Sequence, residues 1–167
     1  EVADDFETIN RFIMNKRWGD GLPAVPPTEA RVAAMLSGSA RRADEIIARV
    51  APGFGAATVE RIAINAVMAG CEPAHLPVLI AATAAVCERR FNLQGVQTTT
   101  DPVAVWLIVN GPIAQQLDMN SGANCLGQGN RANATLGRAL RLILQNIGGA
   151  LPGEMDRATQ GQPGKIS

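Results

Sequence analysis

The stretch LPVLIAATAAVCERR, residues Leu76–Arg90, decides the expected fold. It is apolar on nearly every side of a helix, and Pro77 suits the first helical position. A helix that is apolar all round needs neighbours on all of its sides. We therefore expect a mainly α protein with a small β component, either α+β or α/β, in which several helices pack round this central helix and bury Cys87.

Five further helices are expected because apolar residues recur at helical spacing or a capping residue marks a helix end. They cover Asp4–Lys16, Thr28–Gly38, Arg42–Val50, Thr58–Met68 and Asn130–Ile147. The fold should also hold one or two short buried strands, and the run Val103–Val109 is the one that predicts such a strand convincingly. Pro112 can open a short helix after it.

The length of 167 residues fits one domain. We expect that domain over residues 1–151, followed by a Pro/Gly-rich C-terminal arm or linker over 152–167. The chain begins with Glu1 and ends on a loose Gln-Pro-Gly-Lys-Ile-Ser, so it is expected to be a whole subunit, a trimmed chain or one half of a larger functional unit.

The overall composition argues against several classes of partner. Fifteen basic and fifteen acidic residues give zero net charge, which disfavours nucleic acid and anionic membrane surfaces. The longest uncharged apolar run is well short of the roughly 20 residues that a membrane span needs. Three widely spaced cysteines fit free thiols in a reducing cytoplasm. One histidine and no Cys-x-x-Cys pair predict no metal site, and the sequence leaves any organic cofactor unknown.

Charge is scarce in the second half of the chain. Only five residues between Asn92 and Gly153 are charged: Asp101, Asp118, Arg131, Arg138 and Arg141. So long a segment cannot all be interior in a domain of this size, and obligate interfaces also lose charge. We therefore expect an oligomer, with a second protein chain covering part of this surface.

A Gly- and Asn-rich run, residues 120–130, leads into the last expected helix, where free N–H groups and the helix dipole favour an anion. Gly127-x-Gly129-x-x-Ala132 matches a dinucleotide fingerprint formally, but the preceding strand and following acid are missing. An ordinary capped loop is the other interpretation. The candidate substrate-binding residues are Asn65, Asn110, Asn124, Cys125, Gly127, Gly129, Asn130, Arg131 and Asn133.

Asn133 lies on the core side of its helix, because at 100° per residue it falls close to Leu140. A polar side chain that faces inward must find a partner. Asn133 is therefore either a buried tether to the preceding loop or a donor to a ligand, and the sequence favours neither.

The candidate catalytic residues are Asp20, Cys71 and Glu72. Cys71 follows a helix stop at Gly70, while Cys125 precedes a helix N-terminus, an environment that lowers a thiol pKa. Neither thiol has an adjacent base in the sequence. A general acid or base is expected from Asp20, from Glu72 or from another chain.

Six strings give the chain a family resemblance: Trp18–Pro23, Pro26–Glu29, Ile64–Cys71, Phe91–Thr100, Val109–Pro112 and Gly129–Arg138. Together they resemble an uncharacterised bacterial family that accompanies, or is fused with, UGSC-motif (selenocysteine- or cysteine-Gly-Ser-Cys) proteins. Members of that family continue beyond the equivalent of Gly164-Lys165, and the position of Cys125 need not be cysteine. The resemblance implies that this chain is half of a functional unit.

These observations predict a cytoplasmic subunit of a hetero-oligomeric bacterial enzyme that acts on a small anionic substrate. Its chemistry would be of the redox or carbon–heteroatom bond type, as in an oxidoreductase, a lyase or a hydrolase, and a UGSC-type chain or a C-terminal half would complete it. The alternative is a non-catalytic structural or assembly subunit of the same complex.

Overall fold

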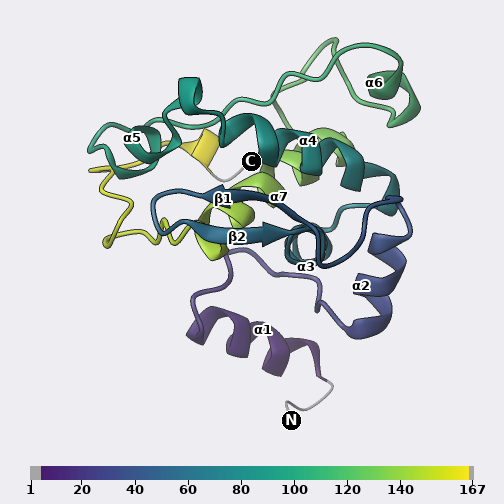
Figure 1. The fold of residues 1–167 in the computed structure, drawn as a ribbon, viewed down its shortest axis with the longest axis horizontal. Coiled ribbons are helices and arrows are strands. Elements are labelled where there is room, and N and C mark those ends of the chain that lie inside the picture. Colours follow the sequence, from purple (N-terminus) through teal and green to yellow (C-terminus); the bar gives the residue numbers. More distant parts are fainter. Residues whose placement is uncertain (1–4, 166–167) are drawn as a thin grey trace.

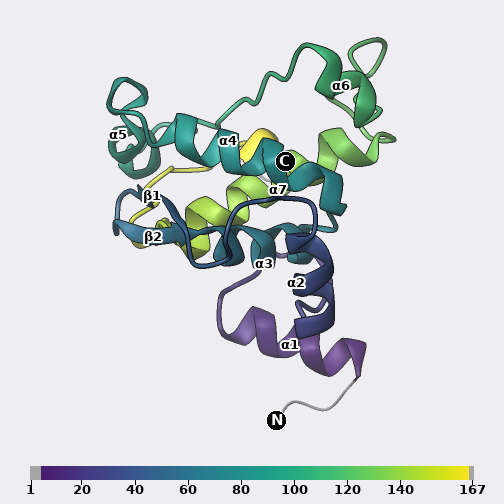
Figure 2. The same ribbon diagram turned by 45° about the vertical axis from the view of Figure 1, so that its right-hand side comes forward.

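The computed structural model describes residues 5–165 as a mainly α protein with a small β component (Figure 1). Its seven α-helices within that range are α1 Phe6–Asn15, α2 Glu29–Leu36, α3 Val59–Ala69, α4 Leu76–Val86, α5 Leu93–Thr98, α6 Pro112–Gln116 and α7 Arg131–Asn146. Three 3₁₀ turns are Pro73–His75, Arg89–Phe91 and Pro163–Lys165, and the strands are β1 Ile46–Val50 and β2 Gly55–Thr58. Helix α1 lies at the end of the molecule opposite α4, α5 and α6 (Figures 1 and 2).

The core is centred on the contact between α3 and α7. Ile62 and Ala66 of α3 and Leu136, Ala139 and Ile143 of α7 are at most 1% exposed. Small alanines on both helices let the two backbones approach closely, since interaxial distance follows the side chains at the contact. The packing of α7 against α3 therefore positions the first turn of α7 and the loop before it.

The helix expected in Leu76–Arg90 forms as α4, but it is not buried on all of its sides. Helix α4 ends at Val86, and it buries one face, which includes Leu79 and Thr83, while Ala81, Ala84 and Ala85 face solvent. Alanine is apolar but small, so an exposed alanine face costs little and imitates a fully buried helix in the sequence. Cys87, expected in the core, is only half-buried at the end of α4.

The prediction of a helix at Arg42–Val50 is wrong, because Ile46–Val50 forms strand β1. Strand β1 pairs antiparallel with β2, with Val50 opposite Gly55 and Ile46 opposite Thr58. The β-branched residues of this segment pack well on a pleated surface. Thr58 then caps α3 by accepting a hydrogen bond from Arg61 N at 3.2 Å.

The other expected helices are confirmed, within a few residues, where a capping residue marks their ends. Thr28 accepts a hydrogen bond from Arg31 N and caps α2. Gly70 ends α3 in the left-handed conformation at φ 87°, which glycine adopts without a steric penalty. Asp5 caps α1, while Asp4, the expected first residue of that helix, lies outside the described residues.

Residues Val103–Val109, expected to form a buried strand, belong to no sheet. Figure 2 shows the chain between α5 and α6 as an uncoiled trace at the edge of the molecule. Val105 and Leu107 pack against the core, whereas Trp106 and Ile108 are 71% and 68% exposed. The side chains thus alternate as in a strand, but no neighbouring strand is present among residues 5–165.

The C-terminal arm expected from residue 152 onward is anchored to the rest of the fold in its described part, up to Lys165. Asp156 lies 3.5 Å from Arg141 of α7 and accepts hydrogen bonds from Lys165. Thr159 N donates to Thr100 O at 3.0 Å. Over residues 5–165 the helices are too short or too polar for any of them to cross a bilayer.

Candidate functional site

Residues 120–130 form a loop between α6 and α7 that Asn133 holds in place. Asn133 Oδ1 accepts a hydrogen bond from Asn120 N at 3.1 Å, and its Nδ2 donates to Asn120 O and Cys125 O at 2.8 and 2.9 Å. The side chain therefore faces inward, as its helical position predicts. These contacts support the tether interpretation of Asn133, because both ends of its amide are bonded to the loop.

Two further asparagines shape the same loop from within. Asn130 caps α7 by accepting from Asn133 N at 2.9 Å, and it donates to Asp118 O at 2.6 Å. Asn124 donates to Gln128 O at 2.8 Å. A Cβ at Gly127 would lie 2.1 Å from Asn124 Oδ1, so a side chain there would require Asn124 to move. The loop is ordered by its own side chains and leaves its backbone available at the surface.

A small cavity of about 120 Å³ lies between this loop, the start of α7 and the exposed segment before α6. Cys125, Leu126 and Gly127 line it from the loop, and Trp106 lines it from the segment. Cys125 is half-buried, and its thiol is the one ionisable side chain in the cavity lining. Three of the predicted binding residues, Cys125, Gly127 and Asn133, therefore meet at this cavity.

Arg131 stands at the first position of α7 and bridges to the end of α3. Its Nε and Nη2 donate to Gly70 O at 3.2 and 3.1 Å, and its Nη1 donates to Glu72 Oε1 at 2.7 Å. The two side chains are 62% and 51% exposed. The structure thus joins Arg131 and Glu72, which lie 59 residues apart in the sequence, in a solvent-exposed ion pair.

Cys71 is buried beside this ion pair, and this burial disfavours the catalytic role expected for its thiol. Its Sγ donates to Thr135 O at 3.3 Å, and burial raises the pKa of the Cys71 thiol to about 11. A thiol with that pKa is protonated at neutral pH, and the thiolate is the nucleophile. Nearby, Glu72 N donates to His75 Nδ1 at 3.1 Å, which ties the histidine to the same turn.

Asp20 is engaged in a buried ion pair with Arg138 of α7. Arg138 donates to both carboxylate oxygens of Asp20, at 2.7 and 2.9 Å, and the side chains are 14% (Arg138) and 5% (Asp20) exposed. Burial opposes ionisation of Asp20, but the hydrogen bonds and charge of Arg138 outweigh it and lower the pKa of the carboxyl. Arg138 also donates to Leu22 O and Pro23 O, so this pair fixes the loop after α1.

Asn65 and Asn110 are not brought to the loop. Asn65 is buried and accepts a hydrogen bond from Asn146 Nδ2 at 2.7 Å. It lines a separate, mostly apolar cavity of about 590 Å³ between α1 and α3. Asn110 is exposed before α6 and lines neither cavity.

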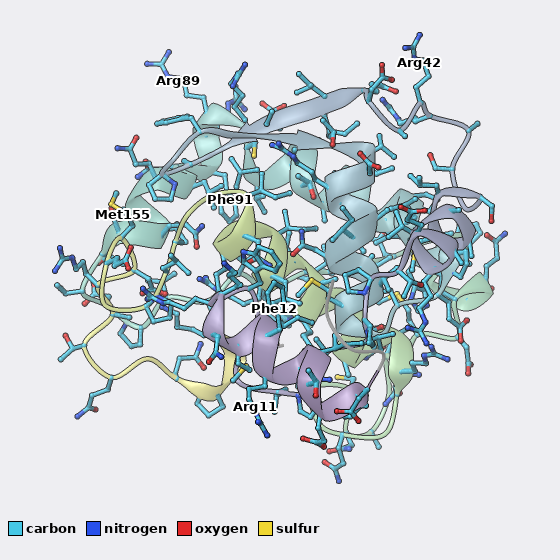
Figure 3. All side chains as sticks on the ribbon, turned by 90° about the horizontal axis from the view of Figure 1, so that it is seen from below. Arg11, Phe12, Arg42, Arg89, Phe91 and Met155 are labelled. Carbon is cyan, nitrogen blue, oxygen red and sulfur yellow. The ribbon has the colours of Figure 1, made fainter. Side chains whose placement is uncertain are left out.

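The wall of the larger cavity includes Phe12, which packs edge-on against Trp18. Figure 3 shows Arg11 and Phe12 on opposite sides of α1, with Arg11 toward solvent. Asn146 also lines this cavity, and its Oδ1 is buried without a hydrogen-bond partner among the described residues. The helical periodicity of α1 could have indicated its apolar face, but nothing in the sequence joins that face to Asn146.

No cluster of three or more His, Cys, Asp or Glu side chains within residues 5–165 is arranged to hold a metal ion. The acidic and sulfur-containing candidates are instead distributed over separate places. Asp20 lies with Arg138, Glu72 with Arg131, and Cys125 at the small cavity.

Alkylation of the native protein should be fastest at Cys125. The loop thiol is half-buried at an open cavity, whereas burial raises the pKa of both Cys71 and Cys87. Iodoacetamide labelling followed by peptide mass mapping measures the three rates, and denatured protein provides the matched reference. Faster labelling of Cys71 than of Cys125 would contradict the burial described for α3 and its end.

No protein family model, no curated protein and no solved structure matches the chain. The family resemblance of the six sequence strings therefore stays a prediction.

Proposed function

We propose that this chain is a subunit of a hetero-oligomeric bacterial enzyme that binds a small anionic substrate at the start of α7. A partner chain of the UGSC type completes its redox or carbon–heteroatom bond chemistry. The observation that carries the proposal is the place of Arg131. Its guanidinium lies at the N-terminus of a 16-residue helix, where the helix dipole already favours negative charge.

The anion would bind where backbone donors are free. The N–H groups of Arg131 and Ala132 make no hydrogen bond to another residue in the described range. Asn130 takes up only the N–H of Asn133. Ala132 is buried, so the first turn of α7 keeps one exposed donor, the N–H of Arg131, beside a cationic side chain, a combination that suits a carboxylate or a phosphate.

Glu72 occupies Arg131 in the free protein and can give way to substrate. Exposed ion pairs contribute only about 0–1 kcal/mol, because solvent screens them and two long side chains must be ordered. An incoming anion gains the helix N-terminus as well as the guanidinium, so it can displace Glu72. The released carboxylate then lies beside the bound anion, where it can accept a proton.

The partner is needed because this chain supplies few free reactive groups. Asp20 is held by Arg138, and Cys71 is buried and protonated. Cys125 remains at the small cavity, whose lining includes neither Arg131 nor Glu72. The partner would supply the missing acid, base or redox group.

A non-catalytic assembly subunit is the second candidate. The exposed apolar side chains Trp106, Ile108 and Leu126 favour it, because patches of this kind mark protein interfaces. In that case the loop at residues 120–130 would be an ordinary helix entry.

Removing the guanidinium separates the two candidates. Arg131→Ala should weaken binding of inorganic phosphate or malonate by about 1.5–3 kcal/mol, the scale of a hydrogen bond to a charged group, with little change in melting temperature. Titration followed by the amide NMR signals of Arg131 and Ala132 measures the binding. Arg89→Ala is the matched control, because Arg89 is exposed and points away from the molecule (Figure 3). Equal binding by both variants, or none by the natural chain, would favour the assembly subunit.

Asn133→Ala should act on stability instead. The change removes the hydrogen bonds to Asn120 and Cys125 O and leaves those backbone groups unpaired, at a cost of about 1–3 kcal/mol in the free energy of unfolding. Urea denaturation measures this loss. Phosphate affinity that falls as far as in Arg131→Ala, with unchanged stability, would assign Asn133 to the anion site.

A further inference from the structure

The segment Val103–Val109 has the composition of a strand but lacks a strand's partner. Seven consecutive apolar residues, rich in β-branched and aromatic side chains, are typical of a strand inside a sheet. In the folded chain the N–H and C=O groups of residues 104–110 make no hydrogen bond to any other described residue. An open row of donors and acceptors of this kind is a template for pairing with another chain.

The outward side chains of the segment form an apolar patch. Trp106 and Ile108 are 71% and 68% exposed, and Leu126 is 79% exposed. Trp106 and Leu126 line the same small cavity, so the loop extends the patch beyond the segment. These fractions correspond to roughly 500 Å² of exposed apolar side chain, a patch size that often marks an interaction site.

We propose that Val103–Val109 is a dimerisation strand, which pairs antiparallel with the same segment of a second copy of this chain. The two-fold axis passes through Trp106, so Val103 pairs with Val109, and Ala104 pairs with Ile108 of the other copy. This register keeps outward residues opposite outward residues, because paired positions always sum to an even number. Val105 and Leu107, which pack on the core, meet on the inner face.

The segment is complementary to itself in size and in charge. Small Ala104 stands opposite large Ile108, and the two Trp106 rings are cross-strand neighbours, an arrangement that stabilises antiparallel pairs. Residues 102–117 carry no charge, and Asp101 falls opposite Gly111 of the second copy. The pairing therefore brings no like charges together.

The available area fits a dimer. A stable interface buries roughly 800 Å² on each partner. Cross-strand contacts between outward side chains, the backbone edge of seven residues and the neighbouring loop would all contribute to that area. This inference does not rest on the anion site, which lies at the start of α7, and it can hold or fail independently of the proposed enzyme function.

Sedimentation of the purified chain at micromolar concentration tests the dimer. We expect a mass of twice 17.5 kDa. Ile108→Lys should abolish the dimer, because a lysine on an edge strand opposes pairing with another edge, while the exposure of Ile108 leaves folding intact. Ile46→Lys is the matched control, since Ile46 is 53% exposed on β1 and should leave the dimer unchanged. A monomeric natural chain, or a dimer that survives Ile108→Lys, overturns the proposal.

Hydrogen exchange then tests the strand pairing itself. Alternate amides within residues 104–109 should be protected in the dimer and should lose that protection in Ile108→Lys. The dimer could also depend on Ile108 while these amides stay unprotected. In that case the two copies would contact each other through side chains without strand hydrogen bonds, which contradicts the proposed pairing. The natural chain could instead be monomeric alone and pair through this segment with a different protein. That result would assign the strand to the other protein and would overturn the proposed homodimer.

Discussion

Replacing Arg138 with alanine is expected to lower the free energy of unfolding by about 3–5 kcal/mol, the usual cost of removing one partner of a buried ion pair. Asp20 would be left with 5% exposure and no counter-charge, and Leu22 O and Pro23 O would lose their donor. Urea unfolding at neutral pH measures the change. Arg42→Ala is the matched control, because Arg42 pairs with Asp44 at 82% exposure and points into solvent (Figure 3).

The same pair makes stability depend on pH. The pKa of Asp20 is lowered in the folded protein from its ordinary value of 3.8. Its contribution to stability is therefore complete above that value and is lost as the pH falls through the lowered folded pKa. Asp20→Asn should reduce the loss of stability in acid. An Arg42→Ala effect as large as that of Arg138→Ala, or an unchanged acid profile in Asp20→Asn, would contradict a buried ionised pair.

Asp156→Ala is expected to have an effect of the same size, about 3–5 kcal/mol, since it leaves buried cations without their counter-charge. Lys165 Nζ donates to both carboxylate oxygens of Asp156 at 2.8 Å, and Arg141 Nη2 lies 3.5 Å away. Arg141 is 15% exposed in its side chain and also donates to Gln97 Oε1 and Ala150 O. The loss would weaken both the core beside α7 and the attachment of the C-terminal segment.

Chemical denaturation and limited proteolysis measure these two consequences of Asp156→Ala. We expect faster cleavage between residues 157 and 165 as well as a lower unfolding midpoint. Glu154→Ala provides the control, because the Arg17–Glu154 pair is exposed and such pairs contribute only about 0–1 kcal/mol. Unchanged cleavage in Asp156→Ala would show that the segment is held by other contacts, such as that of Thr159 with Thr100.

The parts of the fold that could be predicted from the sequence are those with local signals. Thr28, Thr58 and Gly70 mark helix ends by chemistry that acts within a few residues, and these ends are observed. Arg42–Val50 was not predictable in this way, because its conformation depends on pairing with Gly55–Thr58. The exposed face of α4 was also not predictable, because it consists of alanines. Alanine is apolar but occurs at both buried and exposed positions, so its hydrophobicity does not indicate which one applies.

Val103–Val109 shows a different kind of failure. Its residues favour an extended conformation, and the alternating exposure along the segment agrees with one. A strand, however, is defined by a neighbour, and no neighbour lies in the described part of this chain. The sequence could indicate the tendency of the segment but not the chain that satisfies it.

The candidate site was predictable only in its local part. The inward direction of Asn133 and the capped loop before α7 follow from helical geometry and composition. The partners of Asp20 and Arg131 lie 118 and 59 residues away in the sequence, and no spacing rule joins them. The burial of Cys71 likewise results from the packing of α3 against α7, which the residues around Cys71 do not reveal.

The α3–α7 contact at the centre of the core also constrains when the chain can fold. Helix α3, Val59–Ala69, can form this contact only after α7, Arg131–Asn146, has been synthesised. Forming the central contact closes a loop of about sixty residues, and the entropy lost in closing that loop must be offset by packing that forms later. During synthesis, a nascent chain that has released α1 to α4 from the ribosome still lacks its packing partner. We therefore expect the apolar faces of α3 and α4 to be exposed to chaperones until nearly the whole chain has emerged, and the fold to form late and in one step.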